Sequence, residues 1–289
     1  HPAQSQTDGL LKLTEAVVAN LEPLQTGTAE NAEALHERQQ RVARSLPLAI
    51  SLCDTMGLIG DDRAIPTLQR MSELKNRRLR VEASTARIRL KEEAAVEDLV
   101  AMAAEPSVRM RVLAYAEELD LTERLPEEMD TPVARAEAEL VAFLIQPTQM
   151  GLPPISCELL DTRTLYWPSY EEPRICYLFR FEYQVQTKTG PETYINLGIA
   201  GPMVHTLHTD LTDLALEEVY AIFAGWHAEH DEIKHCDIHP DASVDSLPDV
   251  VGELMRTLPD EFTSVQPRSF AMFFGHPVII ATAQKGTAL

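Results

Sequence analysis

A repeated pattern of apolar and small residues constrains the fold of the N-terminal half more than any other feature. Segment 48–52 aligns with 79–83, and the same shift brings 79–83 onto 110–114. Each block has the length and pattern of two helices joined by a short turn. A single helical hairpin cannot bury its apolar face alone. The repeat therefore predicts helical hairpins that stack on one another and share a core.

Turn and cap residues support this prediction. Gly60 is expected to end one helix, because glycine tolerates the left-handed position that follows a helix. Asp61 or Asp62 can then cap the next helix, which has Pro66 in its first turn. A further helix is predicted over residues 76–90. Its apolar stripe consists of Leu79, Ala83, Ala86 and Leu90.

The stretch 56–68, together with residues 79–83, resembles HEAT-like repeats of the phycobilin-lyase type. The resemblance extends over about residues 42–120 and implies an α-helical solenoid. It does not imply one reaction, because these repeats serve scaffolds, chaperones and a few enzymes. A related group of HEAT-repeat hydroxylases carries several His-Glu pairs as iron ligands. This chain has a single such pair, His36-Glu37, so the resemblance does not imply hydroxylase activity. A cofactor or chromophore lyase of the repeat type stays open as an alternative.

We predict two domains that differ in fold class. Residues 1–146 form an all-α domain of HEAT-like hairpin repeats, with capping helices within 10–45 and 122–146. Three prolines and a glycine between residues 146 and 154 mark the boundary. Residues 155–289 form an acidic α+β domain with an antiparallel sheet. In this domain, strands are predicted over 174–186, 192–199 and 269–274, and helices over 210–233 and 248–258.

Charge and composition restrict the classes of partner. The net charge is −20, and residues 121–289 hold 10 Lys and Arg against 26 Asp and Glu. Such an acidic chain repels phosphate backbones, so we expect no nucleic-acid partner. No run of 18 apolar residues occurs, so we expect no membrane association. Residues 1–9 are polar and unlike a secretory signal, and the four cysteines form no CxxC pair, so reduced thiols in a cytoplasmic protein are expected.

The first candidate site is a basic stripe on the helix predicted over 76–90 and just beyond it. Its cations fall within roughly 80° of one helix face. They are Arg77, Arg80, Arg87 and Lys91. Arg111 lies one repeat below Arg80, and such a stripe could hold an acidic peptide or phosphate. Two simpler explanations remain open: Arg80 and Arg111 form a structural ladder in which Arg80 pairs with Asp61 or Asp62, or the cations are merely solvated.

The second candidate site is a histidine cluster in the C-terminal half. Six of the nine histidines lie between residues 205 and 239. The possible zinc ligands are His227, His230, His235, Cys236 and His239. On an ideal helix, the three of these histidines that precede Cys236 span roughly 140°, which is wide for one site. A polar helix end followed by a loop is the simpler explanation.

Signatures of catalytic nucleophiles and of zinc proteases, such as G-x-S-x-G and HExxH, do not occur. The turn at residues 198–202 could bind an anion through backbone N–H groups, but Pro202 removes one donor and a plain tight turn is favoured. The leading hypothesis is a non-enzymatic interaction scaffold or adaptor without a cofactor, whose partner is a protein with an acidic peptide. The curved repeat surface would bind this partner, and the acidic α+β domain would supply a second contact or bind the basic stripe in cis. The main alternative is a zinc-dependent enzyme or ligand-binding domain in the C-terminal half.

Overall fold

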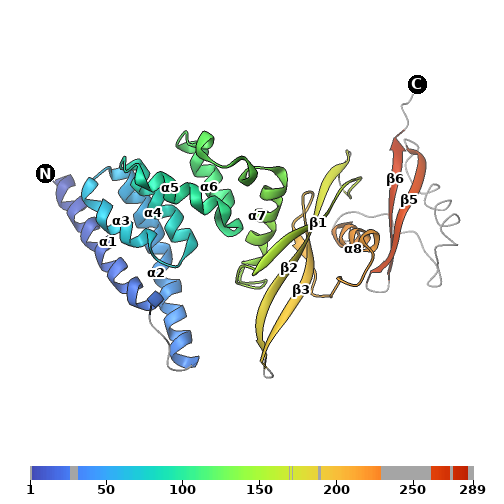
Figure 1. Cartoon of the computed structure of the whole chain (residues 1–289), viewed down its shortest axis with the longest axis horizontal. Coiled ribbons are helices and arrows are strands. Elements are labelled where there is room, and N and C mark those ends of the chain that lie inside the picture. Colours follow the sequence, from blue (N-terminus) through green and yellow to red (C-terminus); the bar gives the residue numbers. More distant parts are fainter. Residues whose placement is uncertain are drawn as a thin grey trace. The chain divides into compact units, whose positions relative to one another are not determined.

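The computed structural model describes residues 2–26, 32–168, 170, 172–187, 190–228, 262–273 and 276–285. The chain divides into two compact units, residues 1–138 and 139–289. Within the described residues, the first unit is helical, and the second combines antiparallel strands with helices (Figure 1). The predicted order, an all-α part followed by an α+β part, is confirmed.

The first unit is a succession of packed helices. The α-helices are α1 (Pro2–Thr26), α2 (Ala32–Ile59), α3 (Ile65–Ser72), α4 (Arg77–Arg89), α5 (Ala94–Ala101), α6 (Pro106–Glu118) and α7 (Pro132–Leu144), the last of which continues into the second unit. Short 3-10 turns are η1 (Asp62–Ala64), η2 (Met102–Ala104), η3 (Thr122–Arg124) and η4 (Glu127–Met129). Helix α4 packs against α2, α3, α5 and α6. The expectation of one helix over 122–146 is wrong in its first third, because Pro126 has an extended backbone and lacks a donor.

The helices recur, but the second interval is shorter than the sequence alignment requires. Helices α4 and α6 each have 13 residues and begin at Arg77 and Pro106. The left-handed residues after α2, α4 and α6 are Gly60, Lys91 and Asp120, with φ of 74°, 66° and 57°. The spacing of these residues equals the predicted shift between Gly60 and Lys91 and is two positions shorter between Lys91 and Asp120. The longer first step contains η1, which lengthens the turn before α3.

The core of the first unit contains the predicted stripe of α4. Leu79, Ala83, Ala86 and Leu90 are all buried, as expected. They pack with buried residues of the preceding helices. These include Val18 and Leu21 of α1, Leu52, Cys53 and Met56 of α2, and Leu68 and Met71 of α3. The predicted cap is confirmed in part: Asp61 accepts a 3.1 Å hydrogen bond from the Arg63 backbone and caps η1, whereas α3 itself begins after Ala64 without a side-chain cap. Pro66 lies in the first turn of α3, as predicted.

Part of α2 is apolar enough to be compared with a membrane span. Among the described residues, His36–Ile59 is the one segment whose length and mean hydropathy of 1.3 satisfy that test. It includes Leu52, Cys53 and Met56, which lie in the core of the first unit. Packing within the unit therefore accounts for these apolar residues.

The second unit is built on a four-stranded antiparallel sheet. Its strands are β1 (Ser156–Leu165), β2 (Arg174–Thr187), β3 (Gly190–Ala200) and β4 (His205–Thr206), in the order β1-β2-β3-β4. The two central strands correspond to the predicted hairpin over 174–199. The unit also contains α8 (Leu216–Ala228) and a separate hairpin of β5 (Phe262–Phe273) and β6 (His276–Lys285), which lies against α8.

Three predictions for the second unit need correction or lie beyond the described residues. The helix expected from residue 210 begins at Leu216, because the Asp210 carboxylate accepts the Thr212 backbone N–H at 2.9 Å and forms a turn instead. The strand expected over 269–274 covers only the end of β5, which starts at Phe262. The helix predicted over 248–258 lies outside the described residues.

Helices cover both faces of the four-stranded sheet. On one face, Cys176, Leu178, Leu197 and Ile199 pack with Val219, Tyr220 and Phe223 of α8. On the other face, Leu140 of α7 approaches Gly198, where a Cβ atom would lie 2.8 Å from a Leu140 methyl group. Phe179, which pairs with Gly198 in the register of β2 and β3, is buried. Gly198, the first residue of the predicted 198–202 turn, therefore allows α7 to pack closely on the sheet.

Candidate binding cavity beside helix α4

The predicted basic stripe lies along α4 and the turn after it, but its members have different surroundings. Arg87 is 3% exposed. Its guanidinium donates to both Glu92 oxygens at 2.9 Å, to Asp98 at 2.9 Å and to Ser72 Oγ at 3.0 Å. The expectation that Arg87 lines an open surface is therefore wrong. The carboxylates of the turn after α4 and of α5 enclose this cation.

Arg77 and Arg80 share one carboxylate. Arg77 donates to Glu105, and Arg80 Nη1 lies 3.5 Å from the other Glu105 oxygen. Glu105 directly precedes α6. The predicted pairing of Arg80 with Asp61 or Asp62 is wrong, because Asp61 forms its ion pair with the nearby Arg63 at 2.6 Å.

Arg111 does not extend the stripe. It pairs with Glu82 at 2.6 Å, and Tyr115 donates to the same carboxylate at 2.5 Å. Glu82 and Arg80 are two positions apart on α4, so their side chains project roughly 160° apart. The expected alignment of Arg111 below Arg80 is therefore wrong, although Arg111 does form a structural ion pair.

Arg111 instead belongs to a second polar surface, which we call the polar row. Arg89 of α4 bridges Asp54 of α2 at 2.6 Å and Glu118 of α6 at 2.7 Å. The polar row consists of Asp54, Glu82, Arg89, Arg111, Tyr115 and Glu118. Because its charges pair across helices, the row holds α2, α4 and α6 in register.

Lys91, the last member of the stripe, is a turn residue. It is exposed and has a left-handed backbone, and its N–H donates to the Ile88 carbonyl at 2.8 Å. Its backbone ends α4, which is a role that glycine more often fills.

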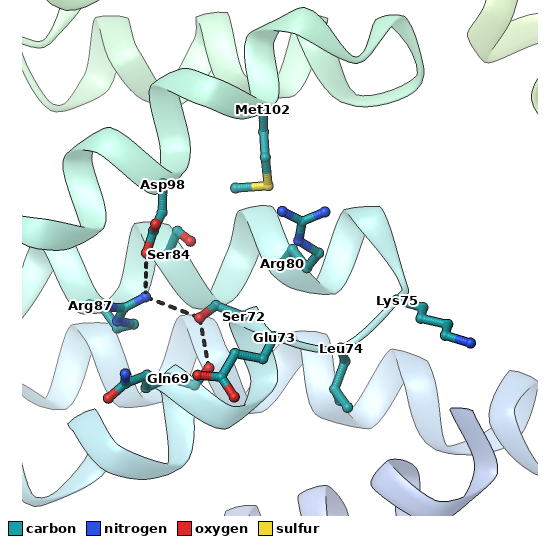
Figure 2. Close-up of a pocket in the computed structure, with 10 residues that line it drawn as sticks. All are labelled: Gln69, Ser72, Glu73, Leu74, Lys75, Arg80, Ser84, Arg87, Asp98 and Met102. Carbon is teal, nitrogen blue, oxygen red and sulfur yellow. Dashed lines mark hydrogen bonds and ion pairs between the residues drawn. The ribbon is translucent and has the colours of Figure 1, made fainter. Parts of the chain in front are cut away.

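A cavity of about 570 Å³ opens beside α4, on the side of the stripe. It lies between the end of α3, the turn to α4, α5 and η2 (Figure 2). Figure 2 shows Arg87 bonded to Asp98 and Ser72 at one end of this group, with Arg80 beside Met102. The lining residues are Gln69, Ser72, Glu73, Leu74, Lys75, Arg80, Ser84, Arg87, Asp98 and Met102. We call it the Ser84 cavity.

Ser84 is the unusual residue of this lining. It is fully buried, and its Oγ has no hydrogen-bond partner within the described part of the protein. A buried hydroxyl left without a partner costs about 1–3 kcal/mol relative to a satisfied one. Ser84 lies one helical turn after Arg80, on the same face of α4. A ligand atom that accepts from Arg80 is therefore close to a second, unused donor.

The charges of the lining favour an anion of low charge. Lys75, Arg80 and Arg87 contribute three cations, and Glu73 and Asp98 contribute two carboxylates. Arg87 is already engaged by its partners, and its hydrogen bond holds the pKa of Glu92 below the usual value of a glutamate. Arg80 has the longest ion pair of the stripe, so its guanidinium is the cation most easily taken by a ligand.

Of the predicted zinc ligands, only His227 lies among the described residues. His227 Nδ1 lies 2.7 Å from the indole nitrogen of Trp167. An indole N–H only donates, so Nδ1 accepts and the Nε2 of a neutral ring carries the proton. In this arrangement His227 offers no lone pair to a metal. His230, His235, Cys236 and His239 lie outside the described residues, and within the described ones no group of three or more His, Cys, Asp or Glu could hold a metal.

Comparison with known proteins gives no further guide. No protein-family model matches the chain, and neither a curated protein nor a solved structure matches it.

Sequence reasoning missed Ser84 and Glu105. Ser84 could have been found, because the spacing 77, 80, 84, 87, 91 places it in the middle of the basic stripe. Glu105 had no such signal, since it lies beyond α5 in the sequence and its contact with α4 depends on how α6 packs.

Proposed function

We propose that this protein is a non-enzymatic interaction scaffold, whose first unit is a short solenoid of HEAT-like helical hairpins that binds an acidic segment of a protein partner. The observation that carries the proposal is the recurrence of α3–α4 as α5–α6, with equal helix lengths and an equal offset between the corresponding helix starts. Repeated hairpins of this kind form extended surfaces that suit protein recognition.

Two features of the helices support the repeat. The polar row joins α2, α4 and α6 through Arg89, which contacts one carboxylate on either side. The left-handed residues Gly60, Lys91 and Asp120 end these three helices in the same way. Both features fit hairpins that stack with one orientation.

The partner surface is best assigned to the side of α4 that carries Arg77, Arg80 and the Ser84 cavity. The polar row is a weaker candidate, because its two arginines are matched by three carboxylates. Around Glu105, two arginines share one carboxylate, which leaves a local positive excess.

The experiment is affinity capture with the full chain as bait, followed by mass spectrometry. Arg77→Ala combined with Arg80→Ala should remove the specific partners, whereas Arg135→Ala, which breaks an exposed ion pair with Asp130 in the same unit, should retain them. Circular dichroism melting curves check that each variant is folded. Recovery of the same partners by the double variant would assign binding to another surface.

A further inference from the structure

We infer that the Ser84 cavity is a specific receptor for a single carboxylate, supplied by a glutamate or aspartate side chain of an acidic peptide, with Arg80 and Ser84 as its donors. This inference rests on the proposed function and gives it a defined contact. Three observations lead to it: a cavity of about 570 Å³, a buried hydroxyl without a partner among the described residues, and an arginine with an incomplete ion pair.

The hydroxyl is the observation that points to a ligand. Ser84 is 0% exposed and lines the cavity, yet its Oγ forms no hydrogen bond within the described residues. Buried polar groups are nearly always satisfied, and an exception requires an explanation. An acceptor oxygen placed in the cavity would satisfy this hydroxyl.

Arg80 supplies the charge. Its Nη1 lies 3.5 Å from Glu105, which Arg77 also contacts, and its side chain is 37% exposed. The guanidinium can therefore turn toward a ligand while Glu105 keeps its bond to Arg77. Because Ser84 Oγ is closed to solvent, the inference requires that this rotation of Arg80 opens the hydroxyl to the ligand.

The other charged residues of the lining select a monoanion. Arg87 is balanced by Glu92 and Asp98, whereas Arg77 and Arg80 share the single carboxylate of Glu105, which leaves one excess positive charge there. Glu73 and Asp98 are the acidic side chains of the lining. One carboxylate balances this excess, whereas a phosphate dianion would be repelled by both acidic side chains. The size of the cavity lies within the range of about 300–1,000 Å³ that is typical of ligand pockets, so it has room for an acidic side chain and its neighbours.

The test is isothermal titration calorimetry on the full chain with three probes at constant ionic strength. They are the blocked peptide acetyl-AEEEA-amide, its glutamine counterpart acetyl-AQQQA-amide, and inorganic phosphate. The glutamate peptide should bind at least ten times more tightly than either of the others. Equal binding of the two peptides, no binding of the glutamate peptide, or tighter binding of phosphate would overturn the inference.

Two matched variants assign the donors. Ser84→Ala should weaken the glutamate peptide several-fold while the melting temperature stays constant or rises, because it removes an unsatisfied hydroxyl. Thr85→Val is the control: Thr85 Oγ1 is also buried without a partner among the described residues, but Thr85 does not line the cavity. It should leave peptide binding unchanged, and an equal effect of the two variants would overturn the role of Ser84. Arg80→Ala should weaken binding tenfold or more, and an unchanged affinity would remove Arg80 from the site.

The outcome is separable from that of the capture experiment. If partners are lost from the Arg77→Ala, Arg80→Ala protein but the glutamate peptide does not bind, the scaffold stands and the carboxylate receptor fails. If the peptide binds as expected but no partner depends on these arginines, the receptor stands and the scaffold fails.

Discussion

The two units differ in how many of their ion pairs join separate elements. In the helical unit, ion pairs join different helices: Arg70 reaches Glu22 of α1, and Arg89 connects α2 with α6. In the sheet unit, Arg180 pairs with Glu182 of the same strand. Arg163 pairs with Asp161 of its own strand and also with Glu217 of α8 at 2.9 Å. A charged pair inside one strand says little about tertiary structure, whereas a pair between helices fixes their register.

The cores differ correspondingly. The largest fully buried side chains of the sheet unit include Tyr220, Phe179, Phe181 and Phe223. The core of the helical unit consists mainly of leucine, alanine, valine and methionine. Small side chains let helices approach closely but specify their relative positions weakly. We conclude that buried arginine pairs supply in the helical unit the specificity that large aromatic side chains supply in the sheet unit.

Loss of a buried arginine should lower the free energy of unfolding more than any other substitution considered below. Arg109 is 4% exposed and donates to the carbonyl oxygens of Ala103 and Ala134 at 2.8 Å and to Glu137 at 2.6 Å. Arg109→Met keeps most of the volume but leaves these acceptors without a donor, so we expect a loss of about 3 kcal/mol in the free energy of unfolding. Urea denaturation measures it.

The control for Arg109 comes from the other unit. Arg180→Met removes an arginine that is 36% exposed and paired within its own strand, so the change should stay within about 1 kcal/mol. If the two substitutions cost the same, buried arginines are not the particular support of the helical unit.

The second test concerns a glycine of the sheet unit that lies close to the backbone of a neighbouring strand. Gly201 has φ of +118°, and a Cβ atom there would lie 2.2 Å from the Ile175 carbonyl oxygen. Gly201→Ala should therefore cost about 2–3 kcal/mol, because the backbone of β2 cannot move away cheaply.

Gly190→Ala separates strain from contact. Gly190 has φ of +135°, but a Cβ atom there would meet nothing within 4 Å. Only the strain of the backbone conformation applies, so a loss of about 1 kcal/mol is expected. Equal losses at the two glycines, measured as shifts of the urea midpoint, would show that contact with Ile175 is unimportant.

These contrasts explain what the sequence could and could not predict. The α4 helix and its buried stripe follow from local spacing and composition, and so do the end of α2 at Gly60 and the β2–β3 hairpin. The second interval is two positions shorter than the predicted repeat, because η1 lengthens one turn and the flanking apolar residues align almost as well with either interval.

The partners of the arginines are the least predictable feature. The stripe on α4 is visible as a set of positions, but the resemblance to HEAT-like repeats implies a pairing of Arg80 with Asp61 or Asp62 instead of Glu105. Depending on how the helices pack, Arg80 could reach any of these carboxylates. Only the tertiary structure shows which one it contacts. The position of Ser84 within the stripe is visible in the sequence, but only the structure shows that its hydroxyl is buried and lacks a partner among the described residues.

The smallest expected effect tests whether the ion pair between α4 and the turn that follows it contributes a pH-dependent stability. Glu92 is bonded to buried Arg87, and this bond holds its pKa below the usual value near 4.5. Since the pKa is lower in the folded protein, the pair stabilises the fold fully above the unfolded pKa, and this stabilisation is lost as the pH falls through the folded pKa. Glu92→Gln should therefore lower the free energy of unfolding by about 1 kcal/mol or less at pH 7, because Asp98 still pairs with Arg87. The difference from the unmodified protein should shrink as the pH falls below the unfolded pKa, and it should vanish once the pH is below the folded pKa, where both Glu92 and its glutamine replacement are neutral. Glu93→Gln, at the exposed neighbouring position, should change stability by no more than about 0.5 kcal/mol at each pH. A difference between Glu92→Gln and the unmodified protein that stays constant from pH 7 to pH 2 would mean that the Glu92 side chain supports the turn by packing, and that its charge contributes little.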